Sequence, residues 1–168
     1  MDDTKGIVAH IPQLRRYARA LTGDYTAAED LVQDTLERAW KRFGLWRAGS
    51  NLRAWLFTIM HNIFINQVRT NPPKQNQNAE HSALHLWGSW TAEDRLELED
   101  LSKALRQLPN EQREVILLIG LEQLSYVEAA KVLGVPIGTV MSRLSRGREQ
   151  LRAIMNGTSA ASQLKVVR

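Results

Sequence analysis

Two arginines in the C-terminal part of the sequence carry its most specific chemistry. Arg143 and Arg146 are three residues apart, so both lie on one face of a helix, and a guanidinium group can donate two hydrogen bonds to a guanine. The hydroxyl groups of Thr139 and Ser142 point outward with them, and Arg148 flanks this face at a position suited to phosphates. These residues predict a helix that binds the major groove of duplex DNA.

A second set of polar and aromatic residues lies in and after the segment that follows Gly44. Amide, guanidinium and indole groups beside a loop can stack on an unpaired base or hydrogen-bond to it. The set comprises Trp46, Arg47, Ser50, Asn51, Asn62 and Asn66. The same residues also fit a core tryptophan with solvent-exposed asparagines, and composition alone favours that simpler interpretation.

The segment 26–43 has one apolar face and one charged face. Its apolar residues, Trp40 among them, recur at steps of three and four positions, as in a helix that packs on a core. The charged face includes Asp30, Gln33, Asp34 and Glu37. Such a face is usually only solvated, and a surface that docks another protein is the alternative.

The composition excludes several classes of protein. The chain has 168 residues, a formal charge of +4 and no cysteine, which excludes disulfides, thiolate metal sites and cysteine nucleophiles. The carboxylates of segment 26–43 lie along a helix face without a basic partner arranged for catalysis, so we expect no catalytic residue, metal or cofactor. No apolar run reaches the ~18 residues of a membrane span, so we expect a cytoplasmic protein without membrane insertion.

The apolar spacing predicts an all-α fold of two small helical domains. Helices are expected at 11–21, 26–43, 51–69, 98–108, 111–121, 126–133 and 137–155. Between residues 71 and 94, Pro72, Pro73, Gly88 and a run of Gln and Asn interrupt the helical periodicity and predict a flexible linker. The residues from 156 onward are expected to form a loose tail.

The last two predicted helices have the pattern of a helix-turn-helix. Ser125 and Glu128 match a capping box at the start of the first helix, and Gly134 suits the left-handed conformation just past its end. Pro136 favours a new helix start, from which Ile137 is expected to point inward. A short helix, a tight turn and a longer helix with outward arginines is typical of DNA binding. A merely solvated basic helix is the alternative.

Four blocks of the sequence together resemble a known family. They occur in order within residues 10–155: LTGDYTAAEDLVQDTLERAWKRF, LRAWLFTIMHN, LPNEQREVILL and LSYVEAAKVLGVPIGTVMSRLSRGREQLR. In order and spacing they are similar to bacterial RNA polymerase sigma factors of the sigma-70 superfamily, in the extracytoplasmic-function (ECF) group. A single helix-turn-helix would be common, whereas four ordered blocks are specific.

The resemblance implies a division of the chain and a set of partners. It implies a region 2 domain at 1–71, a linker at 72–95, a region 4 domain at 96–156 and a tail at 157–168. The whole would bind core RNA polymerase, at the beta-prime clamp helices and the beta flap, and would direct promoter-specific transcription initiation. Promoter DNA and an anti-sigma factor are the other partners that the resemblance implies.

The resemblance also implies roles for the three residue sets. The charged face of segment 26–43 would dock on the clamp helices, the set that begins at Trp46 would melt and bind the minus-10 element, and the residues from Thr139 to Arg148 would bind the minus-35 element. Met141 stands where many members carry a basic residue. The alternative is a stand-alone helix-turn-helix regulator, which would need a dimer face or ligand pocket that the sequence does not show.

Overall fold

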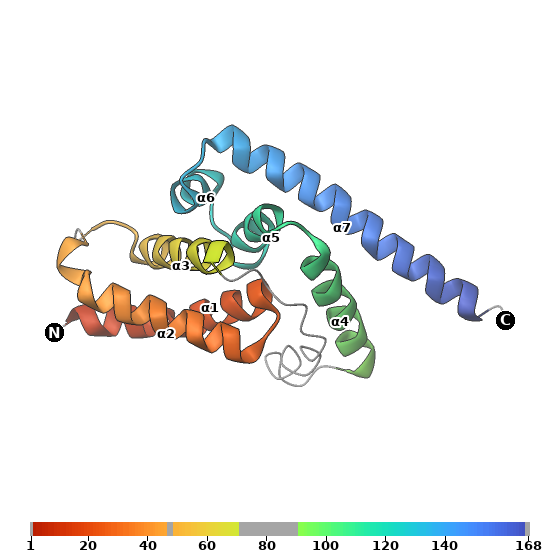
Figure 1. Ribbon diagram of the computed structural model, residues 1–168, viewed down its shortest axis with the longest axis horizontal. Coiled ribbons are helices and arrows are strands. Elements are labelled where there is room, and N and C mark those ends of the chain that lie inside the picture. Colours follow the sequence, from red (N-terminus) through yellow and green to blue (C-terminus); the bar gives the residue numbers. More distant parts are fainter. Residues whose placement is uncertain (1, 47–48, 71–90, 167–168) are drawn as a thin grey trace.

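The computed structural model describes residues 2–46, 49–70 and 91–166. Within these ranges the chain is helical and has no strand, which confirms the predicted all-α fold (Figure 1). Arg47 and most of the predicted linker, residues 72–90, lie outside the described residues. The described residues form two helical halves that contact each other.

The N-terminal half is built from three helices and one short turn. They are α1 (Asp2–Thr22), α2 (Tyr25–Lys41), the 3₁₀ turn η1 (Phe43–Leu45) and α3 (Leu52–Thr70). The carboxylate of Asp24 caps α2 by accepting a hydrogen bond from the backbone N–H of Thr26 at 3.2 Å. α2 buries Ala28, Leu31, Val32, Thr35 and Ala39, which follow the predicted helical spacing. α3 packs against α2 and is largely buried, as expected.

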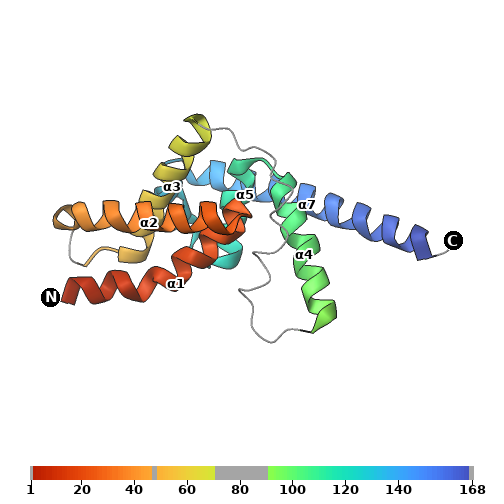
Figure 2. The same ribbon diagram turned by 60° about the horizontal axis from the view of Figure 1, so that its bottom comes forward.

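The first helix begins earlier than the sequence predicts. We expected it to start at Ile11, next to Pro12, but α1 starts at Asp2 and continues through the proline. Figure 2 shows α1 bending along its length, and a proline removes one backbone hydrogen bond of a helix. Ile7 explains the longer helix, because its side chain is buried in the core and holds the turns before Pro12 in place.

The C-terminal half contains four helices and a π turn. They are α4 (Ala92–Gln107), α5 (Asn110–Ile116), the π turn η4 (Leu117–Leu121), α6 (Tyr126–Leu133) and α7 (Ile137–Val166). α4 begins four residues before the boundary expected at 96, because Thr91 and Asp94 form a capping box there. The Ser125 hydroxyl accepts a hydrogen bond from the Glu128 N–H at 3.1 Å, and Gly134 has φ +65° as predicted.

Two expectations for α7 are wrong. The helix continues to Val166 instead of giving way to a loose tail after Met155. Ile137, expected to point inward, is 44% exposed. It is the first residue of α7, and the buried face of the helix centres on Val140 and Leu144, which pack in the core.

The two halves pack against each other. α3 contacts α6, and α1 contacts η4 and α4 (Figure 1). One continuous core runs through both halves, with Leu14 and Phe57 from the first and Val115 and Leu118 from the second. The sequence patterns described two helical bodies but gave no sign that these bodies share a core.

Candidate nucleic-acid and protein interfaces

The predicted DNA-binding residues lie on the first turns of α7. Ser142 and Arg146 are exposed, and Thr139 is half-buried. With Arg143 they line a shallow hollow between α7 and the start of α5, where Glu111 and Gln112 form the other wall. On the opposite side of α7, Val140, Leu144 and Gly147 are buried, so the orientation of the polar face is fixed by packing.

Two side chains of this hollow are partly engaged within the protein. The Arg143 guanidinium lies 3.8 Å from the Glu111 carboxylate, and its side chain is only 25% exposed. The Ser142 hydroxyl donates to the Gly138 carbonyl at 3.0 Å. Because the hydroxyl proton is used in this bond, the Ser142 oxygen remains available only as an acceptor. Such an acceptor can bind the amino groups of cytosine and adenine. Arg146 has the most accessible guanidinium of the predicted base-contacting pair.

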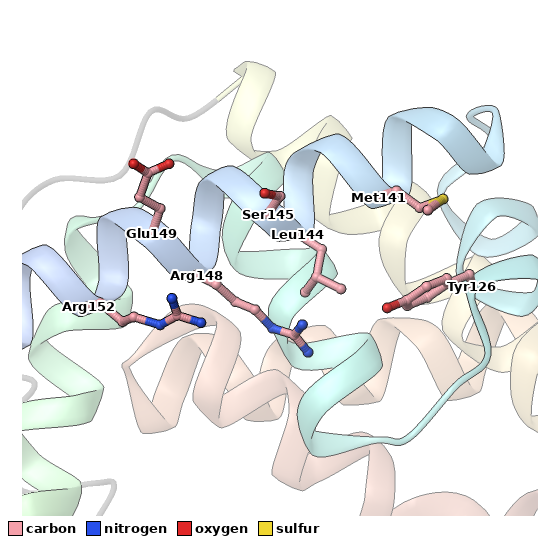
Figure 3. Close-up of a pocket in the computed structure, with 7 residues that line it drawn as sticks. All are labelled: Tyr126, Met141, Leu144, Ser145, Arg148, Glu149 and Arg152. Carbon is pink, nitrogen blue, oxygen red and sulfur yellow. The ribbon is translucent and has the colours of Figure 1, made fainter.

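The other edge of α7 has a different chemistry. A second hollow lies between α7 and α6, and Figure 3 shows the Arg148 and Tyr126 side chains extending toward it. Arg152 lies one helical turn beyond Arg148 along the same edge. Met141, 52% exposed, occupies the end of this hollow next to Tyr126. Two cations and a phenol at the rim of a helix suit phosphate contacts, as predicted for Arg148.

The set predicted to bind an unpaired base is not gathered into one pocket. Trp46 is half-buried with its ring against Phe43 at 5.4 Å between centroids, and its indole N–H is buried without a partner. Asn51 caps α3, its side-chain oxygen accepting from the Ala54 N–H at 3.1 Å. Asn62 is exposed but lies eleven residues further along, roughly 16 Å by the helical rise.

The polar stripe of α3 remains accessible along its C-terminal half. Asn62 and Asn66 are both exposed and one turn apart, so their amides face the same side. Ser50 is exposed at the other end of α3, close to the cap residue Asn51. The structure thus separates the predicted set into two accessible amides on a rigid helix and a supporting group at its start.

The charged face of α2 is exposed as predicted. Asp30, Gln33, Asp34 and Glu37 all lie at the surface. The face is weakly tied to the rest of the protein: Gln67 of α3 donates to Asp34 at 3.5 Å, and Glu37 pairs with Lys41 at 3.0 Å. Pairs this exposed contribute little to stability. These groups are therefore free to exchange partners.

Trp40 of α2 is more exposed than the sequence predicts. It was expected on the buried apolar face, but it is 57% exposed. It forms the rim of an open groove between α1 and α2 with Val32 and Leu36. The buried stripe of α2 ends at Ala39, so the indole lies past the last residue that the core covers.

Three charged residues of the C-terminal half are buried, although the sequence analysis did not predict a role for them. Arg113, Glu114 and Glu122 are each no more than 9% exposed. Arg113 donates hydrogen bonds to the carbonyls of Leu105 (2.7 Å), Arg106 (2.8 Å), Leu108 (2.9 Å) and Leu21 (3.1 Å). It thereby satisfies the carbonyls at the end of α4, which helix ends leave without partners. Burial, followed by the charge of Arg106, lowers the pKa of Arg113 from its ordinary value.

The two buried carboxylates have partners in the other half of the molecule. Glu122 pairs with Arg16 of α1, and Glu114 pairs with the Nδ1 atom of His61 of α3. Tyr17, fully buried nearby, has its pKa raised well above 10 by burial and by the charges of Glu114 and Glu122. A signal was present in the sequence: both carboxylates border the apolar run 115–121, and a charge beside such a run implies a partner.

Within the described ranges, no group of three or more His, Asp or Glu could hold a metal ion. No helix within these ranges combines the length and the apolar character needed to cross a membrane.

Comparison with known families gives two matches. The family described as the Sigma2 domain of PhyR matches residues 7–61, and the family described as Sigma-70, region 4 matches residues 98–151. The chain is also similar to a curated protein of Rhodopseudomonas palustris (strain TIE-1), the ECF RNA polymerase sigma factor EcfG. The two are 39% identical over 150 residues, which cover 89% of this chain and 82% of EcfG.

Two solved structures are similar in both sequence and fold. The sigma factor RpoE from Bartonella quintana, in complex with the anti-sigma factor NepR, shares 36% identity over 92% of this chain and 97% of that chain, with a TM-score of 0.75. CnrH, in complex with the cytosolic domain of CnrY, shares 28% identity over 92% and 88% of the two chains, with a TM-score of 0.69. Since the matches cover both halves in the order of the four sequence blocks, this chain belongs to the ECF group of RNA polymerase sigma factors.

Proposed function

We propose that this sigma factor, which directs transcription initiation, divides the work between its halves. Residues 1–71 bind core RNA polymerase and the minus-10 element, residues 96–156 bind the minus-35 element, and 72–95 connect them. The two family matches, at 7–61 and 98–151, support this division. A stand-alone helix-turn-helix regulator is not favoured, because the relatives match both halves of the chain.

The observation that carries the minus-35 assignment is the packing of α7. Its apolar face is buried, so Thr139, Ser142 and Arg146 are held on the opposite, open side at the N-terminal turns of the helix. A helix-turn-helix places these turns against base edges in the major groove. We assign Arg146 to a guanine, Ser142 to an amino group, and Arg148 to the phosphate backbone. Arg143 joins them once DNA replaces its weak contact with Glu111.

The minus-10 assignment rests on α3. Asn62 and Asn66 present amides from a helix whose other faces are in the core, so they are rigidly placed. An amide can hydrogen-bond to an extruded base, and binding of that base offsets the few kcal/mol that unstacking costs. Trp46, Ser50 and Asn51 fix the start of α3 and the loop before it, and Arg47 completes the set.

Core polymerase would engage the exposed face of α2. Asp30, Gln33, Asp34 and Glu37 form an accessible polar surface for the beta-prime clamp helices, and the C-terminal half would contact the beta flap. Each DNA contact alone is weak, and tethering both to one polymerase raises their effective concentration. This role gives the chain no catalytic step of its own, and its place of work is the cytoplasm, with the polymerase. An anti-sigma partner is proposed from the NepR complex of the RpoE relative.

Run-off transcription with purified core polymerase tests the proposal. The parent chain should direct initiation from a subset of a promoter library. Arg146→Ala should lower promoter-specific transcripts about tenfold, the loss of one bidentate guanine contact worth ~1–3 kcal/mol, without changing core binding. Arg95→Ala, an exposed arginine on α4, serves as the matched control.

A pull-down on core polymerase tests the docking surface separately. The double variant Gln33→Ala with Asp34→Ala should weaken core binding, while Arg146→Ala should not. If the parent chain neither binds core polymerase nor makes its transcription more selective, the proposed function is wrong. Unchanged binding of the double variant would instead place docking elsewhere on the molecule.

A further inference from the structure

We propose that Met141, on the edge of α7 that borders α6, is a specificity-determining residue that binds the methyl group of a thymine in the minus-35 element. This role rests on the proposed function, because it extends the base contacts of α7 to the opposite edge of the same helix. It adds an apolar contact to a surface for which the assigned residues are all hydrogen-bonding.

Met141 is an exposed apolar residue between two buried positions. Its side chain is 52% exposed, although Val140 before it and Leu144 one turn later lie in the core. Ile137, four residues earlier and therefore on the same edge, is 44% exposed. Two large apolar side chains at consecutive turns gain free energy when a partner with apolar groups covers them. This edge of α7 therefore has the chemistry of a contact surface.

The apolar surface continues onto α6. Tyr126, 39% exposed, is the first residue of α6, and Figure 3 shows its side chain and that of Met141 at the same end of the hollow between α6 and α7. Half of the Met141 side chain is exposed in this position, so α6 does not cover it. A thioether side chain is flexible and polarisable, which lets it adapt to a small apolar group.

The charges along this edge indicate how deep in DNA Met141 would lie. Arg148, proposed to contact phosphates, follows Met141 by seven residues, about 10 Å by the helical rise. The major groove is about 8.5 Å deep, and a helix-turn-helix directs the N-terminal turns of its second helix at the base edges. With Arg148 at the phosphates, Met141 is therefore near the bases. The apolar group that a base edge presents in the major groove is the C5 methyl of thymine.

The width of the helix limits where this thymine is. Met141 and Arg146 are five residues apart, which separates them by about 140° around the axis and about 7.5 Å along it. Their contacts on DNA are thus separated by no more than about 13 Å, given a helix of roughly 10 Å across. Because successive base pairs are about 3.4 Å apart, the thymine is expected within about four base pairs of the guanine assigned to Arg146.

Removal of one methyl group from the DNA tests the contact. Replacement of a thymine by deoxyuridine deletes the C5 methyl and keeps every hydrogen-bonding group of the base. The probe is a promoter selected by run-off transcription, with deoxyuridine at each thymine of its minus-35 element in turn, on either strand. At one thymine, deoxyuridine should weaken binding of the holoenzyme about fourfold, the effect of one methyl group returned to water.

Substitutions at Met141 connect this loss to one side chain. Met141→Ala and Met141→Gln should bind the thymine and deoxyuridine promoters equally at that position, whereas Met141→Leu, which stays apolar, should retain most of the fourfold difference. Leu96→Ala is the matched control, because Leu96 of α4 is an apolar residue that is 62% exposed, and it should discriminate as the parent does. Thermal unfolding followed by circular dichroism establishes that the variants are folded.

The outcomes separate this contact from the proposed function. If the parent initiates selectively but no deoxyuridine weakens its binding, or if the difference persists in Met141→Ala, the methyl contact is wrong and the proposed function stands. If Met141→Ala weakens binding to core polymerase and keeps the difference, the apolar edge contacts the polymerase and the methyl contact is again wrong. A parent chain that neither binds core polymerase nor makes initiation selective overturns the proposed function itself.

Discussion

The two halves of the molecule bury polar groups in different ways. In the described part of the N-terminal half no charged side chain is buried. The hydroxyl of buried Thr35 donates to the Leu31 carbonyl one turn earlier at 2.7 Å, and the hydroxyl of buried Tyr17 has no hydrogen-bond partner. The C-terminal half buries Arg113, Glu114 and Glu122, and all three have partners on α1 or α3. The first half thus buries no charge, and the buried charges of the second half have partners in the first.

The same difference appears in the solvent exposure of the paired side chains. Arg16 and His61 keep some contact with solvent, whereas their carboxylate partners are buried. The half that contains the proposed recognition helix is the one whose buried charges depend on its neighbour.

The largest expected effect is at Arg113. Arg113→Ala removes the donor to the carbonyls of Arg106 and Leu108 at the end of α4, and we expect it to lower the free energy of unfolding by about 3–5 kcal/mol, as for a broken buried charge interaction. Urea denaturation measures the loss. Arg113→Lys should recover only part of it, since an ammonium cannot reproduce the fork of donors. A loss below about 1 kcal/mol would contradict the dependence of this half on buried charge.

A smaller effect is expected at the turn between α6 and α7. Gly134→Ala places a side chain at φ +65° and should cost about 1–2 kcal/mol. Gly138→Ala, inside α7 with open space around it, should instead be neutral or stabilising by up to about 1 kcal/mol. The thermal unfolding temperatures of the two variants measure this difference. Both substitutions test local backbone geometry and leave the contacts between the two halves unchanged. Equal effects would show that the turn conformation does not matter.

Tyr17 gives a pH-dependent test from the N-terminal side. Its phenol stays protonated in the folded chain, where its pKa is raised, but ionises near pH 10 in the unfolded chain. Stability is therefore lost as pH rises above about 10, by up to about 1.4 kcal/mol for each further pH unit. Between pH 9 and pH 11, Tyr17→Phe should lose about 1 kcal/mol less than the parent in urea denaturation. Parallel losses in the two proteins would count against a buried neutral phenol.

The smallest effect is expected at Thr35. Thr35→Val removes a hydroxyl that bonds only to a carbonyl of its own helix, so the cost should stay below about 1 kcal/mol. Urea denaturation under the same conditions gives the losses in unfolding free energy of Thr35→Val and Arg113→Ala. The ratio of these two losses measures the difference between the halves. A cost at Thr35 similar to that at Arg113 would remove the distinction.

The sequence predicts local structure here better than it predicts contact between distant segments. The cap at Ser125, the left-handed Gly134 and the buried face of α2 all follow from spacing within one helix or turn. The accessible residues of the candidate surfaces, such as Arg146 and Asn62, follow from the same periodicity. Where the prediction is wrong, at Ile137 and Trp40, the residue lies at the edge of a buried stripe, and only the neighbouring helices decide its exposure.

The interface between the halves could not be predicted from these patterns. Arg16 and Glu122 are separated by 106 residues, and the apolar run beside Glu122 implies that this carboxylate has a partner without indicating which residue it is. The sequence places Trp46 and Asn51 in the set that could bind an unpaired base. Whether the amide of Asn51 caps a helix or faces a ligand depends on the path of the loop before it. Helical spacing says which side of a helix is apolar and leaves open what that side meets.

The length of α7 gives the molecule a lever. A helix from Ile137 to Val166 is about 45 Å long by the helical rise. Val140 and Leu144 are buried in the core and Leu151 and Ile154 pack against it, so the residues after Ile154 form the part that extends beyond the core. Figure 1 shows its far end projecting from the body of the protein. A force on this distal end therefore acts through a lever arm on the anchored turns of α7, which include the turns that we propose to face DNA.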